Sequence, residues 1–149
     1  MGNEILKGDR FMDRKDFLLT LGKGAAIAGI AYCVGCAANN NDVPTAPTGV
    51  DMTLDLSQSA NSALNTVGGS IVNNGIIIGR TGTSSFVAVS SACTHQGTTI
   101  QFQLNNNRFY CNNHGSTYAL DGTVTLGPAA RNLVKYNTTF SGNSLRIYS

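Results

Sequence analysis

The sequence contains no tryptophan, few charged residues and only two histidines. Asp, Glu, Lys and Arg make up 12% of the 149 residues, and the formal net charge is +2. Because no basic stripe or basic run is present, nothing in the sequence points to nucleic acid as a partner. A weakly charged protein gains little from long-range electrostatic steering, so its partner must be found through shape and local contacts, or through tethering.

Convincing amphipathic helices are also absent after residue 50, where Gly, Asn, Ser and Thr separate short runs that favour strands. Asn73-Asn74-Gly75 is typical of a hairpin turn, and residues 57–64 are expected to form no more than a turn or two of helix. The pattern predicts an all-β fold, an antiparallel β-sandwich or small barrel. The expected strands are residues 50–56, 71–72, 76–78, 86–89, 98–104, 108–110, 123–126, 138–140 and 144–148.

Residues 1–36 are expected to be a signal peptide or a membrane anchor. Arg14 and Lys15 precede an apolar run, which is typical of a secretory signal, and their order resembles a twin-arginine signal with Lys15 in place of the second Arg. Val34-Gly35-Cys36 resembles a lipoprotein cleavage box, which would make Cys36 the lipidated first residue of the mature chain. An uncleaved anchor and a cleaved, free protein remain alternatives.

Residues 37–49 are polar, contain two prolines and show no periodicity. This composition predicts a flexible linker that holds the domain away from the membrane. The predicted organisation is therefore a signal or anchor over residues 1–36, a linker over 37–49 and one domain over 50–149.

Two of the four cysteines, Cys33 and Cys36, lie in the apolar N-terminal segment, and the other two each share a short motif with one of the two histidines. The motifs are Cys93-Thr94-His95-Gln96-Gly97 and Cys111-Asn112-Asn113-His114-Gly115-Ser116. Each follows a predicted strand, so two adjacent loops could bring two thiolates and two imidazoles to one point. Such a set could hold structural zinc, although zinc sites usually pair Cys with Cys and His with His. A Cys–His nucleophile lacks the usual helix-start context here.

The pattern C-x-H-x15-C-x2-H-G-S resembles the Rieske [2Fe–2S] signature. The resemblance implies one cluster per chain, with Cys93 and Cys111 on the buried iron and His95 and His114 on the outer iron. It spans about residues 86–148, and it implies the Rieske fold with two cluster-binding loops.

Residues other than the four implied ligands also resemble the Rieske family. Ser116 and Tyr118 stand where high-potential Rieske proteins have a Ser and a Tyr, which implies hydrogen bonds to a cluster sulfur and to a ligand Cys sulfur. The segment from Gly127 and Pro128 to Leu133 resembles the family's proline-containing loop, which covers the cluster.

The sequence departs from the respiratory members of that family at Thr98 and Asn113. Those members carry a second Cys in each loop at these positions, and the two form a disulfide. In this respect the chain resembles the ferredoxin-type members. The mixture of the two types predicts an intermediate to high reduction potential.

The resemblance implies an electron carrier without a substrate pocket of its own, in which His95 or His114 couples proton uptake to electron uptake. Together with the export signal, it predicts a domain on the periplasmic side of a bacterial inner membrane. Quinol or a donor complex would supply electrons, and a cytochrome or an oxidoreductase subunit would accept them. Alternatives are the small subunit of a periplasmic oxidase, a ferredoxin-like carrier for an oxygenase, a β-domain with structural zinc, and an adhesin-like lipoprotein.

Overall fold

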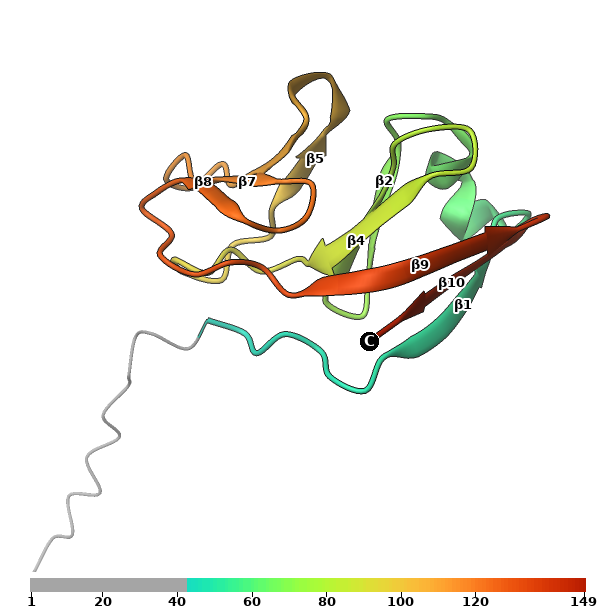
Figure 1. The fold of residues 1–149 in the computed structure, drawn as a ribbon, viewed down its shortest axis with the longest axis horizontal. Coiled ribbons are helices and arrows are strands. Elements are labelled where there is room, and N and C mark those ends of the chain that lie inside the picture. The colour runs from blue at the N-terminus through green and yellow to red at the C-terminus, as the bar shows by residue number, and fades with distance from the viewer. Residues whose placement is uncertain (1–42) are drawn as a thin grey trace, which may run out of the picture. The chain divides into compact units, whose positions relative to one another are not determined.

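The computed structural model describes residues 43–149, which form two antiparallel sheets and two short 3-10 helices (Figure 1). The all-β prediction is therefore confirmed. The expected signal or anchor over residues 1–36, including Cys36, lies outside the described residues. Within residues 43–149, no helix has the length and apolar character that crossing a membrane requires.

The larger sheet has six strands in the order β1-β10-β9-β4-β3-β2. Each pairs with its neighbours in the antiparallel sense. Asn74 and Gly75 adopt positive φ angles of 48° and 77°, so the Asn-Asn-Gly turn forms the predicted hairpin. The strands are β1 (Asp51–Asp55), β2 (Ser70–Asn73), β3 (Ile76–Arg80), β4 (Phe86–Ser90), β9 (Lys135–Ser141) and β10 (Ser144–Tyr148).

The smaller sheet contains β5 (Gln101–Gln103), β6 (Arg108–Tyr110), β7 (Thr117–Ala119) and β8 (Val124–Leu126), in that order. The chain enters it after β4 and leaves it before β9, and β4 and β9 are hydrogen-bonded neighbours in the larger sheet. The smaller sheet is therefore an insertion between two adjacent strands. Both Cys–His motifs belong to this insertion, and Figure 1 shows it beside the larger sheet.

Three details differ from the expected elements, the first being that β9 covers Lys135–Ser141 where only residues 138–140 were expected. The strand expected over residues 98–104 is limited to β5 and ends in the 3-10 helix η2 (Leu104–Asn106), because Thr99 pairs with Ala92 in an isolated bridge that closes the first motif into a loop. Strand β7 was not expected, since it is only three residues long and directly follows the second motif. The weak helix expected over residues 57–64 is the 3-10 helix η1 (Ser59–Asn65).

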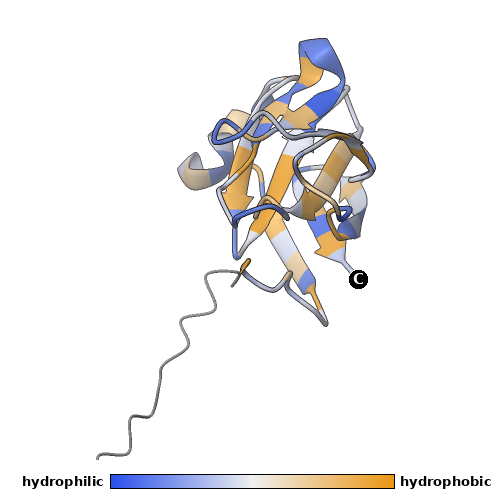
Figure 2. Ribbon diagram, turned by 90° about the vertical axis from the view of Figure 1, so that its left-hand side faces the viewer, coloured by the Kyte–Doolittle hydropathy of each residue, from blue (hydrophilic) through white to orange (hydrophobic). Residues whose placement is uncertain are grey.

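Strands β3 and β4 separate two apolar cores because alternate residues of a strand point to opposite faces. Ile78 and Ala88 face the first core, while Ile77 and Val89 face the second core, which lies against the smaller sheet. Figure 2 shows apolar residues, in orange, on several of the strands. The second core contains Cys93 and Cys111, so the two thiols lie in apolar surroundings.

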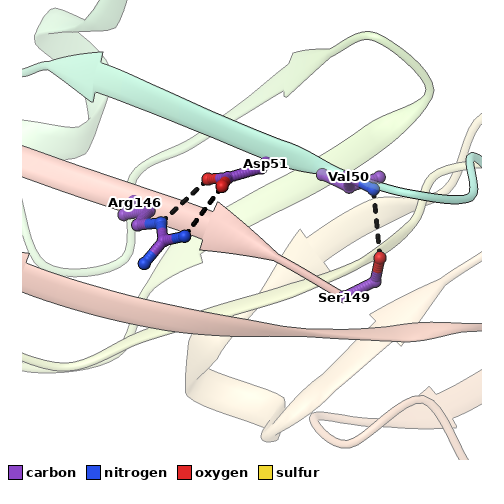
Figure 3. Close-up of polar contacts among 4 residues, drawn as sticks. All are labelled: Val50, Asp51, Arg146 and Ser149. Carbon is purple, nitrogen blue, oxygen red and sulfur yellow. Dashed lines mark hydrogen bonds and ion pairs between the residues drawn. The ribbon is translucent and has the colours of Figure 1, made fainter.

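The N-terminal end of β1 is fixed to the C-terminal end of β10. Arg146 donates from Nε and Nη2 to the two carboxylate oxygens of Asp51, at 2.8 and 2.7 Å (Figure 3). The Val50 N–H donates to Ser149 Oγ at 3.0 Å, and the Ser149 N–H donates to the Val50 carbonyl at 3.0 Å. The ion pair is exposed and adds little stability, but the contacts define where the preceding segment enters the domain.

The second half of the expected linker contacts the domain. Tyr136 on β9 donates a hydrogen bond to the Pro47 carbonyl at 2.7 Å, and Pro44 lies against Gly97 of the first Cys–His motif. Residues 44–47 therefore differ from the free tether that their polar, proline-containing composition predicted, because their backbone and proline rings find partners on the domain surface.

Leu64 of η1 is fully buried in the first core, so Leu64→Ala should lower the free energy of unfolding by about 2–4 kcal/mol through lost contacts and a cavity. Val67→Ala is the matched control in the same segment. Val67 is 49% exposed, and its truncation should change stability by less than about 0.5 kcal/mol. Guanidinium unfolding measures both. Equal effects would contradict the assignment of Leu64 to the core.

Candidate metal centre

The two Cys–His motifs form loops with the same backbone closure. In the first loop, the Cys93 N–H donates to the Thr98 carbonyl at 2.8 Å, and the Gly97 N–H donates to the Cys93 carbonyl at 2.7 Å. In the second loop, the Cys111 N–H donates to the Ser116 carbonyl at 2.9 Å, and the Gly115 N–H donates to the Cys111 carbonyl at 3.0 Å. Both glycines have positive φ, 74° and 77°, which favours glycine at this point of each turn.

The four predicted ligands lie together as two pairs. The thiols of Cys93 and Cys111 are neighbours, and both residues are only 1% exposed. Nδ1 of His95 lies 3.1 Å from Nδ1 of His114, and the rings meet edge to face. His114 is exposed and His95 is partly buried, so the sulfur pair lies inside and the imidazole pair lies at the surface.

This arrangement suits two metal ions better than one. A single zinc ion needs its donors around one point, with bonds of about 2.0–2.3 Å. No group of three or more His, Cys, Asp or Glu residues within 43–149 could hold one ion together. A [2Fe–2S] cluster with two Cys on one iron and two His on the other fits an inner sulfur pair and an outer nitrogen pair.

Tyr118 is fully buried, and its hydroxyl contacts three groups of the first loop. The oxygen lies 3.2 Å from Cys93 Sγ and 3.2 Å from Thr94 Oγ1, and it accepts the Thr94 N–H at 3.1 Å. The Thr94 hydroxyl donates to the Arg131 carbonyl at 2.6 Å, so Thr94 Oγ1 can only accept from Tyr118. The single phenol proton is therefore shared between Thr94 Oγ1 and the Cys93 sulfur.

The surroundings of the two thiols shift their pKa values in opposite directions. Burial raises the pKa of Cys93, but hydrogen bonds from the Tyr118 hydroxyl, the Cys111 thiol and the backbone of His95 and Gln96 together bring it below its usual value. Burial and the neighbouring Cys93 raise the pKa of Cys111. Burial, followed by the contact with Cys93, raises the pKa of Tyr118 to about 12, so the phenol stays protonated and can donate.

Residues 127–133 connect the two loops. The Ala129 N–H donates to Ser116 Oγ at 3.0 Å, and the Arg131 carbonyl accepts from Thr94 of the first loop. Ser116 is fully buried, and since its oxygen accepts from Ala129, its own proton remains available for a further acceptor. Ala129 and Leu133 pack into the core that contains both cysteines, whereas Gly127 and Pro128 are exposed.

Of the two positions that carry the disulfide cysteines in respiratory members, Asn113 contacts the first loop at a different residue, Gln96. Asn113 donates from Nδ2 to Gln96 Oε1 at 3.4 Å, which links the two loops at the surface. Thr98 contributes its carbonyl to the closure of the first loop.

All eight residues predicted for the site belong to the two loops, to β7 or to the adjoining segment 127–133. Thr94 was not predicted, although it connects Tyr118, Cys93 and Arg131. Its position between Cys93 and His95 was the only signal in the sequence, because no spacing pattern marks a hydroxyl residue that supports a ligand.

A family model described as the Rieske [2Fe–2S] domain matches residues 50–137. The chain is 37% identical over 59 residues to the cytochrome b6-f complex iron–sulfur subunit of Synechococcus sp. (strain JA-2-3B'a(2-13)), covering 40% of this chain and 34% of that protein. It is 33% identical over 63 residues to the subunit of the same name from Chlorobaculum thiosulfatiphilum, covering 42% and 35%. The alignments thus span about a third of the length of these curated relatives.

The structure is also similar to the crystal structure of the plasma membrane Rieske protein from the cyanobacterium Synechocystis PCC 6803. The TM-score is 0.50 and the sequence identity is 30%, and the match covers 59% of this chain and 93% of that chain. The likeness therefore includes nearly the whole of that solved domain.

Tyr118→Phe should lower the midpoint potential of the bound cluster by about 50 mV, because a hydrogen bond to sulfur worth about 1 kcal/mol stabilises the extra electron. Phe keeps the buried ring and removes only the hydroxyl. Tyr148→Phe, on β10 of the larger sheet, is the matched control and should leave the potential unchanged. Protein-film voltammetry measures both, and an unchanged potential in Tyr118→Phe would show that the phenol proton does not serve the sulfur.

Proposed function

Because the chain belongs to the Rieske [2Fe–2S] family and carries one such cluster, we propose that Cys93, His95, Cys111 and His114 ligate it and that the protein transfers electrons within a quinol-oxidising membrane complex. The observation that carries the proposal is the pairing of two buried thiols inside and two imidazoles outside. When bound, the cluster supplies a site that accepts and releases one electron.

The residues of the chain have separate parts in this function. Cys93 and Cys111 bind at the buried end, where the apolar core excludes water. Tyr118 can donate its hydroxyl proton to the Cys93 sulfur, which lies 3.2 Å away, and Ser116 has a proton to donate toward the cluster sulfurs. Such donors favour the reduced state and support an intermediate to high reduction potential.

The histidines supply the contact with a partner. Since Nδ1 of each ring faces the other ring, Nδ1 is the nitrogen that we assign to iron, and Nε2 remains for a partner molecule. An imidazole nitrogen at the surface can accept a hydrogen bond from a quinol and hold the proton that leaves with the electron. His114 is the more exposed of the two and is the stronger candidate.

The proposed partners follow from the relatives and from the N-terminal sequence. Two relatives are iron–sulfur subunits of cytochrome b6-f complexes, and they support a quinol or donor complex on one side and a cytochrome or oxidoreductase subunit on the other. The basic and apolar residues of positions 1–36 support export to the periplasmic side of the inner membrane. Lipidation of Cys36, or an uncleaved anchor, would keep the domain at that membrane.

The full-length chain, reduced with dithionite, should give a rhombic Rieske-type EPR signal with two irons and two sulfides per chain. Cys111→Ser should abolish the signal, because serine does not replace a soft thiolate ligand on this cluster. Cys33→Ser is the control, since Cys33 lies outside both motifs, and it should retain the signal. A colourless, EPR-silent wild-type chain that binds zinc tightly would overturn the proposal.

Membranes from cells that lack this chain should lose quinol-dependent cytochrome reduction, and the wild-type gene should restore it. The Cys111→Ser gene should not restore it, because the variant lacks a proposed ligand of the cluster. Unchanged electron flow in the deletion strain would contradict the respiratory role. Mass spectrometry of the membrane-extracted chain separates the two anchors, because lipidation predicts a chain that begins at a lipidated Cys36, whereas an uncleaved anchor predicts an intact N-terminus with unmodified Cys36.

A further inference from the structure

Residues 43–48, here called the strap, lie beside the first Cys–His loop. Together with segments around Ser90, Thr94 and residues 131–134, they enclose a hollow of about 350 Å³. Thr94, which lines the hollow, belongs to the hydrogen-bond network of Cys93 and Tyr118. It is also adjacent in sequence to two of the proposed ligands, Cys93 and His95. The strap therefore lies close to the first ligand loop.

Pro44 contacts the residue that closes the first loop. A Cβ atom placed on Gly97 would lie 2.6 Å from Pro44 Cδ, closer than real side chains approach one another. The Gly97 N–H donates to the Cys93 carbonyl and so completes the turn that carries His95. The equivalent residue of the second loop, Gly115, has nothing within 4 Å of the same position. The strap therefore braces one loop and leaves the other open.

The other end of the strap is fixed to the larger sheet. The Tyr136 hydroxyl donates to the Pro47 carbonyl at 2.7 Å, and Tyr136 is 2% exposed with its ring in the first core. Pro47 also packs on the β2–β3 hairpin, since a Cβ atom on Gly75 would lie 3.2 Å from Pro47 Cγ. The strap thus connects a rigid part of the domain with the first loop.

We propose that Pro44 and Tyr136 are positioning residues, which act through the strap to hold the first ligand loop and with it His95. The inference rests on the proposed function, because it requires this loop to bind the cluster. Pro44 restrains the backbone at Gly97 directly, and Tyr136 keeps the strap in place at Pro47. Loss of either contact gives the loop more freedom and makes its ligands easier to detach from iron.

The first test compares iron release from full-length variants in the presence of a ferrous chelator. Pro44→Ala and Tyr136→Phe should each release iron about fivefold faster than the wild type, the factor expected for the loss of one modest contact. Both should also shift the midpoint potential and the EPR g-values, which report on the ligand geometry. Leu64→Ala is the control for a purely structural effect, and in the folded protein it should leave the potential and the EPR signal unchanged.

A second test uses the similarity of the two loops. Gly97→Ala and Gly115→Ala introduce the same strain at a positive φ, but only Gly97→Ala collides with Pro44. Gly97→Ala should therefore release iron faster than Gly115→Ala, and adding Pro44→Ala should recover part of the loss because it removes the ring atom that the new methyl group meets.

The outcomes separate this inference from the proposed function. A wild-type chain without the Rieske signal overturns both. If the wild-type chain gives the signal but Pro44→Ala and Tyr136→Phe keep its iron-release rate and midpoint potential, only the role of the strap is overturned. The strap also fails if the double variant Gly97→Ala with Pro44→Ala is no better than Gly97→Ala by itself.

Discussion

Two thiols that lie side by side in an apolar interior repel one another when both ionise. The residues of the smaller sheet and its loops must therefore stabilise negative charge on the two sulfurs. Cys93 receives hydrogen bonds from Tyr118 and from the backbone of its own loop, whereas burial and its neighbour hold the pKa of Cys111 high. Iron held by the two thiolates, as proposed, would relieve the remaining repulsion through its positive charge. The second core and residues 127–133 keep water from the pair, which makes the hydrogen bonds to sulfur stronger than they would be in water.

Because there are two cores, the residues packed around the two cysteines differ from those that stabilise the larger sheet. Strands β3 and β4 contribute to both cores through alternate side chains, so they act as a common wall. The two Cys–His loops close through their own backbone hydrogen bonds, and they meet the larger sheet through this wall and the strap. Loop residues can therefore adjust the cluster while the larger sheet maintains stability.

The sequence was sufficient for the elements in which local chemistry determines the conformation. The β2–β3 hairpin follows from Asn74 and Gly75, and the two Cys–His motifs, whose loops end in glycine, lie together as their pattern indicated. Contacts between distant segments were beyond prediction. Strand β7 exists because β6 and β8 lie on either side of it, and Thr94 acquires its role only when Tyr118 and Arg131 approach from elsewhere. The docking of Pro44 and Pro47 had no sequence signal, since polar, proline-containing segments usually form linkers.

The pairing of β1 with β10 has a consequence for the order in which the domain is completed. Asp51 pairs with Tyr148, so the first strand of the domain finds its partner only after the other strands of the domain have been synthesised. The ligand loops and their enclosing segments lie between β4 and β9, so they can assemble earlier from contacts that are closer in sequence. Until β10 is synthesised, β1 and the neighbouring edge of β9 lack the strand that pairs with both of them. An incomplete chain therefore exposes a sheet edge, which is a point where a nascent protein can pair with another chain.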